Sequence, residues 1–316
     1  MSMRDKPLVP DLVSIVVLNY NKRECLRRTL TNVQSLPGGN REVMVVDNNS
    51  SDGSVEMVRT EFPEVRLIAM DRNTGVAGGR NAGYHAARGA YIISLDDDVI
   101  CPADTIERTV RLFEENPQAG CLAYLIHMHP KDYFMNKVTS SVLGNYAGGA
   151  HAFRHAPLRD IGYLDERFFF GAQEIDASLR LREAGYLTLY VPHLVIDHYG
   201  PLAKGGERGR RMVRALASWC WFYWKHFPLC HAVFFSCRVA VSFAVAAVRH
   251  RQYLEFFKGC WTFLRGLPSV WRVRRVASAS TVAFYIRPDT EPPHYNVSIL
   301  KKAGRKLRRL LASQRN

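Results

Sequence analysis

Three adjacent carboxylates, Asp96, Asp97 and Asp98, are the strongest chemical signal in the sequence. They follow the apolar run Tyr91–Leu95, which predicts a buried strand that ends at the triplet. Neighbouring carboxylates repel one another unless a cation is present. Oxygen ligands at this density suit Mn²⁺ or Mg²⁺, which can also bridge phosphate oxygens. A solvated acidic turn is the alternative, but the apolar strand before the triplet favours a metal site.

Other polar residues also follow apolar runs. Asn19 and Tyr20 come directly after Val13–Leu18, and Asp47 comes directly after Glu42–Val46. We expect Asp47 to accept a hydrogen bond from the ring N–H of a pyrimidine and Tyr20 to lie against that base. The stretch that begins at Asp47 is also typical of a turn with a helix cap, since it is rich in Asn, Asp, Ser and Gly.

Two glycine-rich segments suit a ligand that approaches the backbone. Residues 73–81 open an expected helix, so their free backbone N–H groups and Arg80 predict an anion site. Gly148 and Gly149 permit close contact between the backbone and a ligand, with a flexible linker as the alternative.

A regular alternation of apolar runs and amphipathic segments positions these residues. Strand–helix alternation at this spacing predicts an α/β fold with a doubly wound, mainly parallel sheet, in which ligands bind beyond the carboxyl ends of the strands. The expected strands are Val13–Leu18, Glu42–Val46, Val65–Ala69 and Ala90–Leu95. The expected helices are Lys22–Ser35, Ser54–Glu61 and Gly79–Arg88.

Five motifs in unbroken order resemble the inverting glycosyltransferases of family two, which have the GT-A fold. The motifs are Val13–Asn21, Val45–Gly53, Asn73–Gly83, Tyr91–Asp98 and Gly162–Gly185. The chain is most similar to the bacterial branch that contains rhamnosyltransferases and other polysaccharide-assembling enzymes. The resemblance implies metal-dependent, inverting transfer of a sugar from a UDP- or dTDP-linked donor to a hydroxyl of a lipid-linked or surface-polysaccharide acceptor.

The resemblance also implies roles for individual residues. Asp98 is the ligand of Mn²⁺ or Mg²⁺, and His198 touches the metal or the diphosphate, with an ordinary structural histidine as the alternative. Glu174 is the catalytic base and Asp176 the second candidate, although acids in the first turn of a helix also favour its dipole. The expected contacts to the nucleotide sugar are Asn19, Tyr20, Asp47, Arg80, Asp96, Asp97, Gly148 and Gly149.

Charge separates the chain into regions. Residues 1–199 contain 21 Lys and Arg against 25 Asp and Glu, whereas residues 200–316 contain 22 against 4, so the net charge of +14 arises in the last third. We expect an N-terminal tail over residues 1–12, a catalytic domain over 13–205, and a basic, aromatic-rich helical extension over 206–316. Such an excess of cations predicts a polyanionic partner.

An anionic membrane surface is the partner that we expect for this extension. The aromatic cluster Trp219–Trp224 and the basic segment Lys301–Leu311 suit a headgroup interface. Leu229–Val248 is long enough to cross a bilayer, but Arg238 within it would cost about 2.5–3.5 kcal/mol at the centre. Helices that lie in the interface are therefore favoured. Because the N-terminus lacks the apolar run of a signal peptide, we expect peripheral attachment at the cytoplasmic face.

Other functions compete with this prediction. A nucleotidyltransferase that makes sugar nucleotides would need a glycine-rich, arginine-containing loop after the first strand, where this chain has Asn19–Lys22. A polyprenyl-phosphate glycosyltransferase is an alternative within the same family. A nucleic-acid-binding protein would use the basic tail, but it leaves the triplet and Glu174 without a role, so we expect no nucleic-acid partner. Formation of a homo-oligomer is a further possibility that the sequence leaves open.

Overall fold

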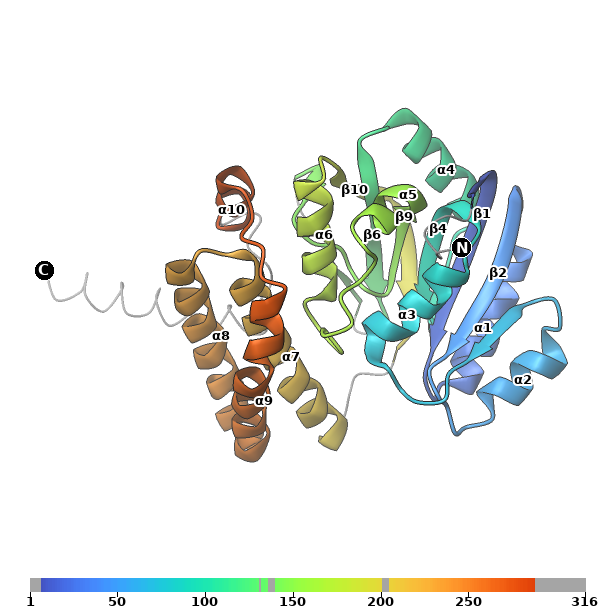
Figure 1. Cartoon of the computed structure of the whole chain (residues 1–316). Coiled ribbons are helices and arrows are strands. Elements are labelled where there is room, and N and C mark those ends of the chain that lie inside the picture. Colours follow the sequence, from blue (N-terminus) through green and yellow to red (C-terminus); the bar gives the residue numbers. More distant parts are fainter. Residues whose placement is uncertain (1–6, 131, 136–139, 201–204, 288–316) are drawn as a thin grey trace, which may run out of the picture. The chain divides into compact units, whose positions relative to one another are not determined.

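Figure 1 shows the computed structural model of the chain, which describes residues 7–130, 132–135, 140–200 and 205–287. The basic segment Lys301–Leu311 lies outside the described residues. The chain divides into two compact units: residues up to 202, together with Arg287, form the first, and residues 203–286 form the second. The first unit is a mixed α/β domain, and the second consists of helices.

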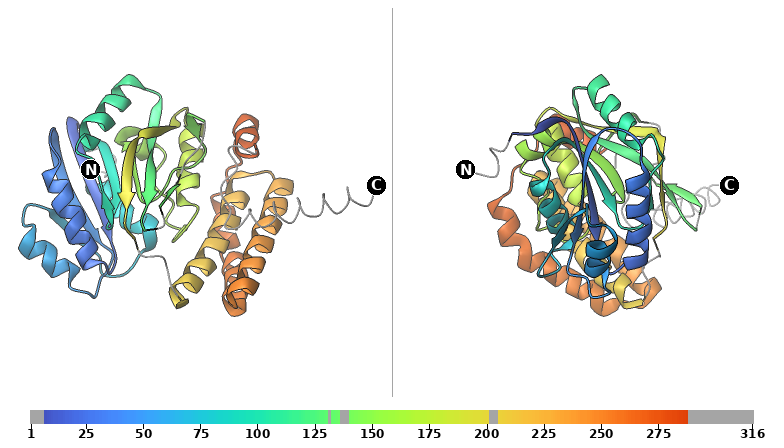
Figure 2. Two further views of the ribbon diagram at one scale, coloured as in Figure 1. Left: turned by 180° about the vertical axis from the view of Figure 1, so that it is seen from behind. Right: turned by 90° about the vertical axis from the view of Figure 1, so that its right-hand side faces the viewer.

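Parallel strands form one half of the sheet in the first unit. Ile15 and Val17 of the central strand pack with helices on one face of the sheet, and Val16 packs with a helix on the other face. The right-hand view of Figure 2 shows helices on both sides of the sheet. These observations confirm the predicted doubly wound arrangement. The strands, in spatial order, are β3 (Arg66–Ala69), β2 (Asn40–Asp47), β1 (Val9–Asn19) and β4 (Gly89–Asp96).

Three helices connect these strands, and their positions follow the predicted alternation. They are α1 (Arg23–Ser35), α2 (Ser54–Glu61) and α3 (Gly75–Ala86). Helix α3 begins earlier than the predicted Gly79 because its glycines pack on the sheet. A Cβ atom at Gly79 would lie 2.6 Å from Leu18 Cδ1, and one at Gly83 would lie 3.0 Å from Val46 Cγ2. Close helix–sheet packing therefore overrides the weak helix propensity of glycine.

An antiparallel strand joins this half of the sheet to a second half. Strand β9 (Ala150–Arg154) lies between β4 and β6 (Ala119–Met128) and is antiparallel to both. The order continues with β10 (Leu187–His198), parallel to β6, and β5 (Val99–Ile100), antiparallel to β10. The sheet is mainly parallel, as predicted, but the sequence does not predict β9. The remaining elements are α4 (Thr105–Glu115), β7 (Tyr133–Met135), β8 (Val142–Leu143), α5 (His155–Asp160) and α6 (Gln173–Glu183).

Aromatic side chains form the core of the second unit. Phe222 is fully buried, and its ring contacts the rings of Tyr223, Phe227 and Tyr285. The expectation that Trp219–Trp224 lies at a headgroup interface is wrong for its buried members, because burial in the helical core stabilises these rings more than a partly wet surface would. The helices are α7 (Gly205–His226), α8 (Leu229–His250), α9 (Tyr253–Arg272) and α10 (Ala279–Tyr285).

Candidate active site

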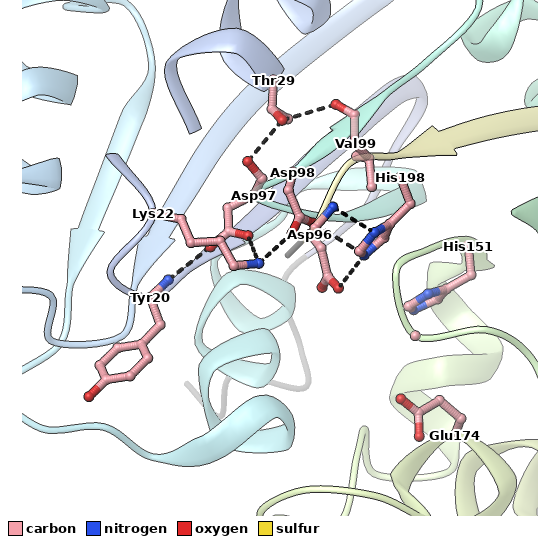
Figure 3. A network of polar contacts seen from close by, with 12 residues as sticks. Tyr20, Lys22, Thr29, Asp96, Asp97, Asp98, Val99, His151, Glu174 and His198 are labelled. Carbon is pink, nitrogen blue, oxygen red and sulfur yellow. Dashed lines mark hydrogen bonds and ion pairs between the residues drawn. The ribbon is translucent and has the colours of Figure 1, made fainter. Parts of the chain in front are cut away.

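The acidic triplet lies where strands β4, β5 and β10 meet. Asp96 is the last residue of β4, and β5 pairs with β10 so that Val99 lies opposite His198. This pairing places His198 Nε2 at 3.2 Å from Asp98 Oδ1 and at 3.8 Å from Asp96 Oδ2. Figure 3 shows the imidazole pointing toward both carboxylates. The short strand β5 thus brings together residues that are far apart in the sequence.

The donor atoms of this cluster fit a divalent metal ion. Ligand atoms of Asp96, Asp98 and His198 all lie within 4.8 Å of one another. Among the described residues, none donates a hydrogen bond to Asp98 Oδ1, which is buried. A buried acceptor without a donor is unfavourable unless a cation or a ligand completes it. The cluster offers two carboxylates and one imidazole as ligands, and carboxylate oxygens suit Mn²⁺ or Mg²⁺.

Lys22, just before helix α1, neutralises part of the triplet. Its Nζ atom donates hydrogen bonds to Asp97 Oδ1 at 2.9 Å and to Asp98 Oδ2. Although burial opposes the charge on Lys22, the two carboxylates raise the pKa of its ammonium group above the usual range. Burial and the neighbouring carboxylates raise the pKa of Asp97, while Lys22 opposes this shift. The Thr29 hydroxyl holds the turn through the Asp97 and Val99 carbonyls (Figure 3).

Arg80 lies beneath the site and contacts Asp96. Its buried guanidinium donates through Nη2 to Asp96 Oδ1 at 2.6 Å and to the Gly148 carbonyl, and Nη1 lies 3.3 Å from His151 Nε2. Burial alone would raise the pKa of Asp96, but Arg80 and His198 lower it to about 2. The structure therefore places Arg80 under a carboxylate of the triplet, instead of at an open anion site.

Gly148 and Gly149 pass between the triplet and helix α6. The carbonyl of Gly149 accepts a hydrogen bond from the Asp96 N–H at 2.8 Å. A Cβ atom at Gly148 would lie 2.6 Å from Glu174 Oε1, and one at Gly149 would lie 2.8 Å from His198 Cδ2. Side chains here would displace Glu174 or His198, so glycine permits the close approach that the site requires.

The two candidate bases on helix α6 have different surroundings. Glu174 accepts a hydrogen bond from Gln173 Nε2 at 2.7 Å, and burial raises its pKa to about 7, although the Arg80 charge opposes this shift. Asp176 is fully buried and pairs with Arg180 Nε at 2.7 Å. Arg180 also donates to the carbonyls of residues 161 and 163, so this pair anchors the helix. Glu174 is therefore the better placed base.

The predicted base-binding residues lie together after β1 and β2. Asn19 Nδ2 donates to Asp47 Oδ2 at 2.7 Å, and the N–H of Ser50 donates to Asp47 Oδ1 at 2.8 Å. The Tyr20 backbone N–H donates a hydrogen bond to Asp97, while the residue is 47% exposed and its ring points away from the triplet in Figure 3. Asp47 is therefore buried and held in place, and Tyr20, directly after Asn19, leaves its side chain accessible to a ligand.

Sequence reasoning did not identify Lys22, Thr29 or His151 as parts of the site. The signal for Lys22 is its position three residues after the end of β1, at the sheet edge that receives the triplet. The contacts of Thr29 and His151 depend on long-range packing, to which no local motif points.

Residues 14–165 match the family model described as Glycosyl transferase family 2. The chain therefore carries a glycosyltransferase family 2 domain. The succinoglycan biosynthesis protein ExoO of Rhizobium meliloti (strain 1021) is 42% identical over 114 residues, which are 35% of this chain and 31% of that protein. The poly-β-1,6-N-acetyl-D-glucosamine synthase of Staphylococcus epidermidis is 24% identical over 214 residues, 61% of this chain and 51% of that protein. The chain thus spans only a third to a half of these relatives.

Solved structures confirm the GT-A type of fold. A structure of GalNAc-T7 with UDP, GalNAc and Mn²⁺ aligns with a TM-score of 0.60 at 15% identity, covering 74% of this chain and 51% of the other. The mannosyltransferase PcManGT of Pyrobaculum calidifontis, solved with GDP-Man and Mn²⁺, aligns with a TM-score of 0.56 at 19% identity, covering 88% and 79%. The predictions of the fold and of an enzyme are confirmed.

We expect Lys22→Met to lower the free energy of unfolding at pH 8 by about 1–3 kcal/mol in metal-free buffer, because two buried carboxylates lose their cation. Added Mn²⁺ should restore part of the loss, since a cation held by the cluster of Asp96, Asp98 and His198 would again offset the charge of Asp98. Urea denaturation with and without Mn²⁺ measures both effects. Lys22→Arg is the control that keeps the charge. Wild-type stability of Lys22→Met without metal would contradict the role assigned to Lys22.

Proposed function

We propose that this chain is an inverting, metal-dependent glycosyltransferase of polysaccharide assembly. It transfers a sugar from a nucleoside diphosphate to a hydroxyl of a glycan or lipid-linked acceptor. One observation carries the proposal. Glu174 lies against Gly148, and the cluster of Asp96, Asp98 and His198 lies against the adjacent Gly149. The match to the family model supports sugar transfer, and the names of the two relatives support a polysaccharide product.

The donor is held at the carboxyl ends of β1, β2 and β4. Asp47, with Asn19 beside it, accepts the ring N–H of a uracil or thymine, and the exposed Tyr20 ring covers the base. Asp96 faces the ribose and is kept ionised and in place by Arg80. Asp98 and His198 would hold Mn²⁺ or Mg²⁺, which supplies charge stabilisation for the departing diphosphate when it is bound.

Glu174 acts on the acceptor in a single displacement. The acceptor hydroxyl oxygen forms a bond to the anomeric carbon on the face opposite the diphosphate. The bond between that carbon and the diphosphate oxygen breaks, and its electron pair leaves with the diphosphate. Glu174 takes the hydroxyl proton, so charge and atoms balance and the configuration inverts. One carboxylate suffices, in contrast to the pair that flanks the bond in glycoside hydrolysis.

The first test concerns the metal ligand. Asp98→Asn keeps the size of the side chain but removes its charge, so Mn²⁺-dependent binding of UDP should weaken at least about tenfold, a loss of about 1.4 kcal/mol. Calorimetry with UDP in the presence and absence of Mn²⁺ measures this. Glu174→Gln is the matched control and should bind UDP like the wild type. Unchanged Mn²⁺-dependent affinity in folded Asp98→Asn would remove Asp98 as a ligand.

The second test concerns the base. Glu174→Gln cannot take a proton, so kcat should fall about 10²–10⁴-fold with UDP binding retained. In the wild type, protonation of Glu174 inactivates the enzyme, so kcat/KM should fall about tenfold per pH unit below pH 7 and level off above it. A product assay over pH 5–9 measures both. Near wild-type turnover of Glu174→Gln, with chemistry rate-limiting, would transfer the role to another residue.

We also propose that the helical unit attaches to the surface of an anionic membrane. Helix α9 exposes an apolar stripe at helical spacing: Leu254, Phe257, Trp261, Leu264 and Trp271. Each of Lys258, Arg265 and Arg272 is exposed and directly follows a residue of this stripe. An apolar stripe bordered by cations is typical of helices that lie in the headgroup region, where each cation contributes about 1 kcal/mol.

Helix α8 supports surface attachment over insertion. It is the one described helix long and apolar enough to cross a membrane, with a mean hydropathy of 1.8. One of its faces packs within the helical unit through Phe235, Val239 and Phe243. Arg238 near its middle is half-buried, and its guanidinium lies 5.6 Å from the centre of the Phe235 ring. Insertion would expose this charge or the packed face to hydrocarbon, at a cost of several kcal/mol.

Replacing Phe257 and Trp261 by Ser should lower binding to anionic vesicles, because shallow apolar insertion is lost. Replacing Lys258, Arg265 and Arg272 by Glu should abolish the preference for anionic lipid and its weakening in high salt. Flotation with neutral and anionic liposomes measures binding. The control is Arg111→Glu, which reverses the charge of an exposed arginine in the first unit. Salt-resistant binding to both lipids would favour an inserted α8, and no binding would end the membrane proposal.

A further inference from the structure

A second cluster of metal-ligating side chains lies at the ends of strands β6 and β10, one residue away from His198. His127 is in β6 and His129 directly follows the last residue of that strand, and the centroids of their rings lie 4.1 Å apart. Asp197 is the register partner of His127 across the parallel pair. Because neighbours in a strand point to opposite faces, Asp197 and His198 face opposite sides of β10.

Both imidazoles contact the same carboxylate oxygen of Asp197. His127 Nδ1 lies 3.0 Å and His129 Nε2 lies 2.8 Å from the same atom, Asp197 Oδ1. Each residue offers one ligand atom, and these atoms lie within 4.8 Å of one another. On its other side, His127 Nε2 lies 2.7 Å from Asp132 Oδ1. A carboxylate on the far nitrogen of a histidine is the arrangement that orients metal-binding imidazoles.

Stacked rings hold both imidazoles in place. His127 stacks on Phe134 of β7, with ring centroids 4.6 Å apart and planes at 17°. His129 stacks on Tyr199 at 4.5 Å and 7°, and the guanidinium of Arg28 lies 5.1 Å from the centre of the Tyr199 ring. The histidines are therefore preorganised, so their side chains lose little conformational entropy when an ion binds.

We propose that His127, His129 and Asp197 form a second metal site, of the zinc type, distinct from the site of Asp98 and His198. Two imidazole nitrogens and a carboxylate oxygen are ligands that Zn²⁺ prefers over Mg²⁺. Neighbouring ligands of a tetrahedral Zn²⁺ lie about 3.4 Å apart. The two nitrogen–oxygen distances, 2.8 and 3.0 Å, would lengthen by a few tenths of an ångström in such a site, and the two nitrogens already lie within 4.8 Å of each other.

An ion here would join the end of β6 to the end of β10. The next residue of β10 is His198, so the site would fix the strand end that carries a ligand of the first metal. The site is structural and takes no part in sugar transfer. Its existence therefore does not depend on the proposed function, and the two can fail separately.

The test uses the full chain, stripped of metal and titrated with Zn²⁺ against a chromophoric chelator. The wild type should bind about two Zn²⁺ ions, because each site offers imidazole and carboxylate ligands. The Asp98→Asn variant should still bind Zn²⁺ at the proposed second site. Adding His129→Gln or His127→Gln to this variant should abolish that binding. Co²⁺ in the same background should give the visible absorption of a site with nitrogen ligands, and the two histidine variants should lose that absorption.

His193→Asn in the same background is the matched control, because His193 is exposed on β10 but outside the cluster. It should keep the Zn²⁺ ion. Circular dichroism identifies any variant that fails to fold, and the two independent histidine substitutions keep the test decisive. Equal Zn²⁺ binding by the parent, His127→Gln and His129→Gln would overturn the proposal. So would equal loss in His193→Asn, since binding would then belong to surface histidines in general.

Discussion

The mutual repulsion of three carboxylates is the constraint on which the rest of the site depends. Asp96, Asp97 and Asp98 lie at the end of one strand, and burial of ionised groups in close proximity is unfavourable unless each finds a cation. The fold supplies two cations, Arg80 from α3 and Lys22 from the segment after β1, and β10 adds the imidazole of His198, which lies 3.2 Å from Asp98 Oδ1. Asp98 Oδ1 is left without a hydrogen bond among the described groups, and this deficit is what a metal ion would satisfy.

The sheet topology brings these charges together. Strands β4, β6 and β10 run in one direction, because β9 is antiparallel to both β4 and β6 and β10 is parallel to β6, so His198 ends at the same edge of the sheet as Asp96 and Asp47. Strand β9, which is antiparallel, places the glycine pair beside the end of β4, and β5 couples the triplet to β10. The glycines then let helix α6 approach so closely that any side chain at Gly148 would meet the Glu174 carboxylate.

How much the sequence predicts depends on the distance over which each feature is determined. The strands and helices up to Asp96 arise from local periodicity, so their positions were predictable within a few residues, and the triplet follows from its strand. The insertion of β9, the burial of Arg80 and the pairing of Asp176 with Arg180 depend on contacts between remote segments, which local patterns do not encode. The aromatic cluster around Phe222 misled for the same reason, because a helical core and a headgroup interface select the same residue types.

The two carboxylates near Arg80, those of Asp96 and Glu174, have pKa values shifted in opposite directions. This difference suits one of them to stay charged and the other to accept a proton. Asp96 accepts a hydrogen bond from the guanidinium, which lowers its pKa to about 2, so it stays ionised at neutral pH. Glu174 feels the same cation only at longer range and is hydrogen-bonded to neutral Gln173, so burial dominates and its pKa is about 7. A carboxylate with that pKa is ionised for part of the time near neutral pH and still holds a transferred proton well. Separation of pKa values by environment is how two identical groups serve as an electrostatic anchor and a base.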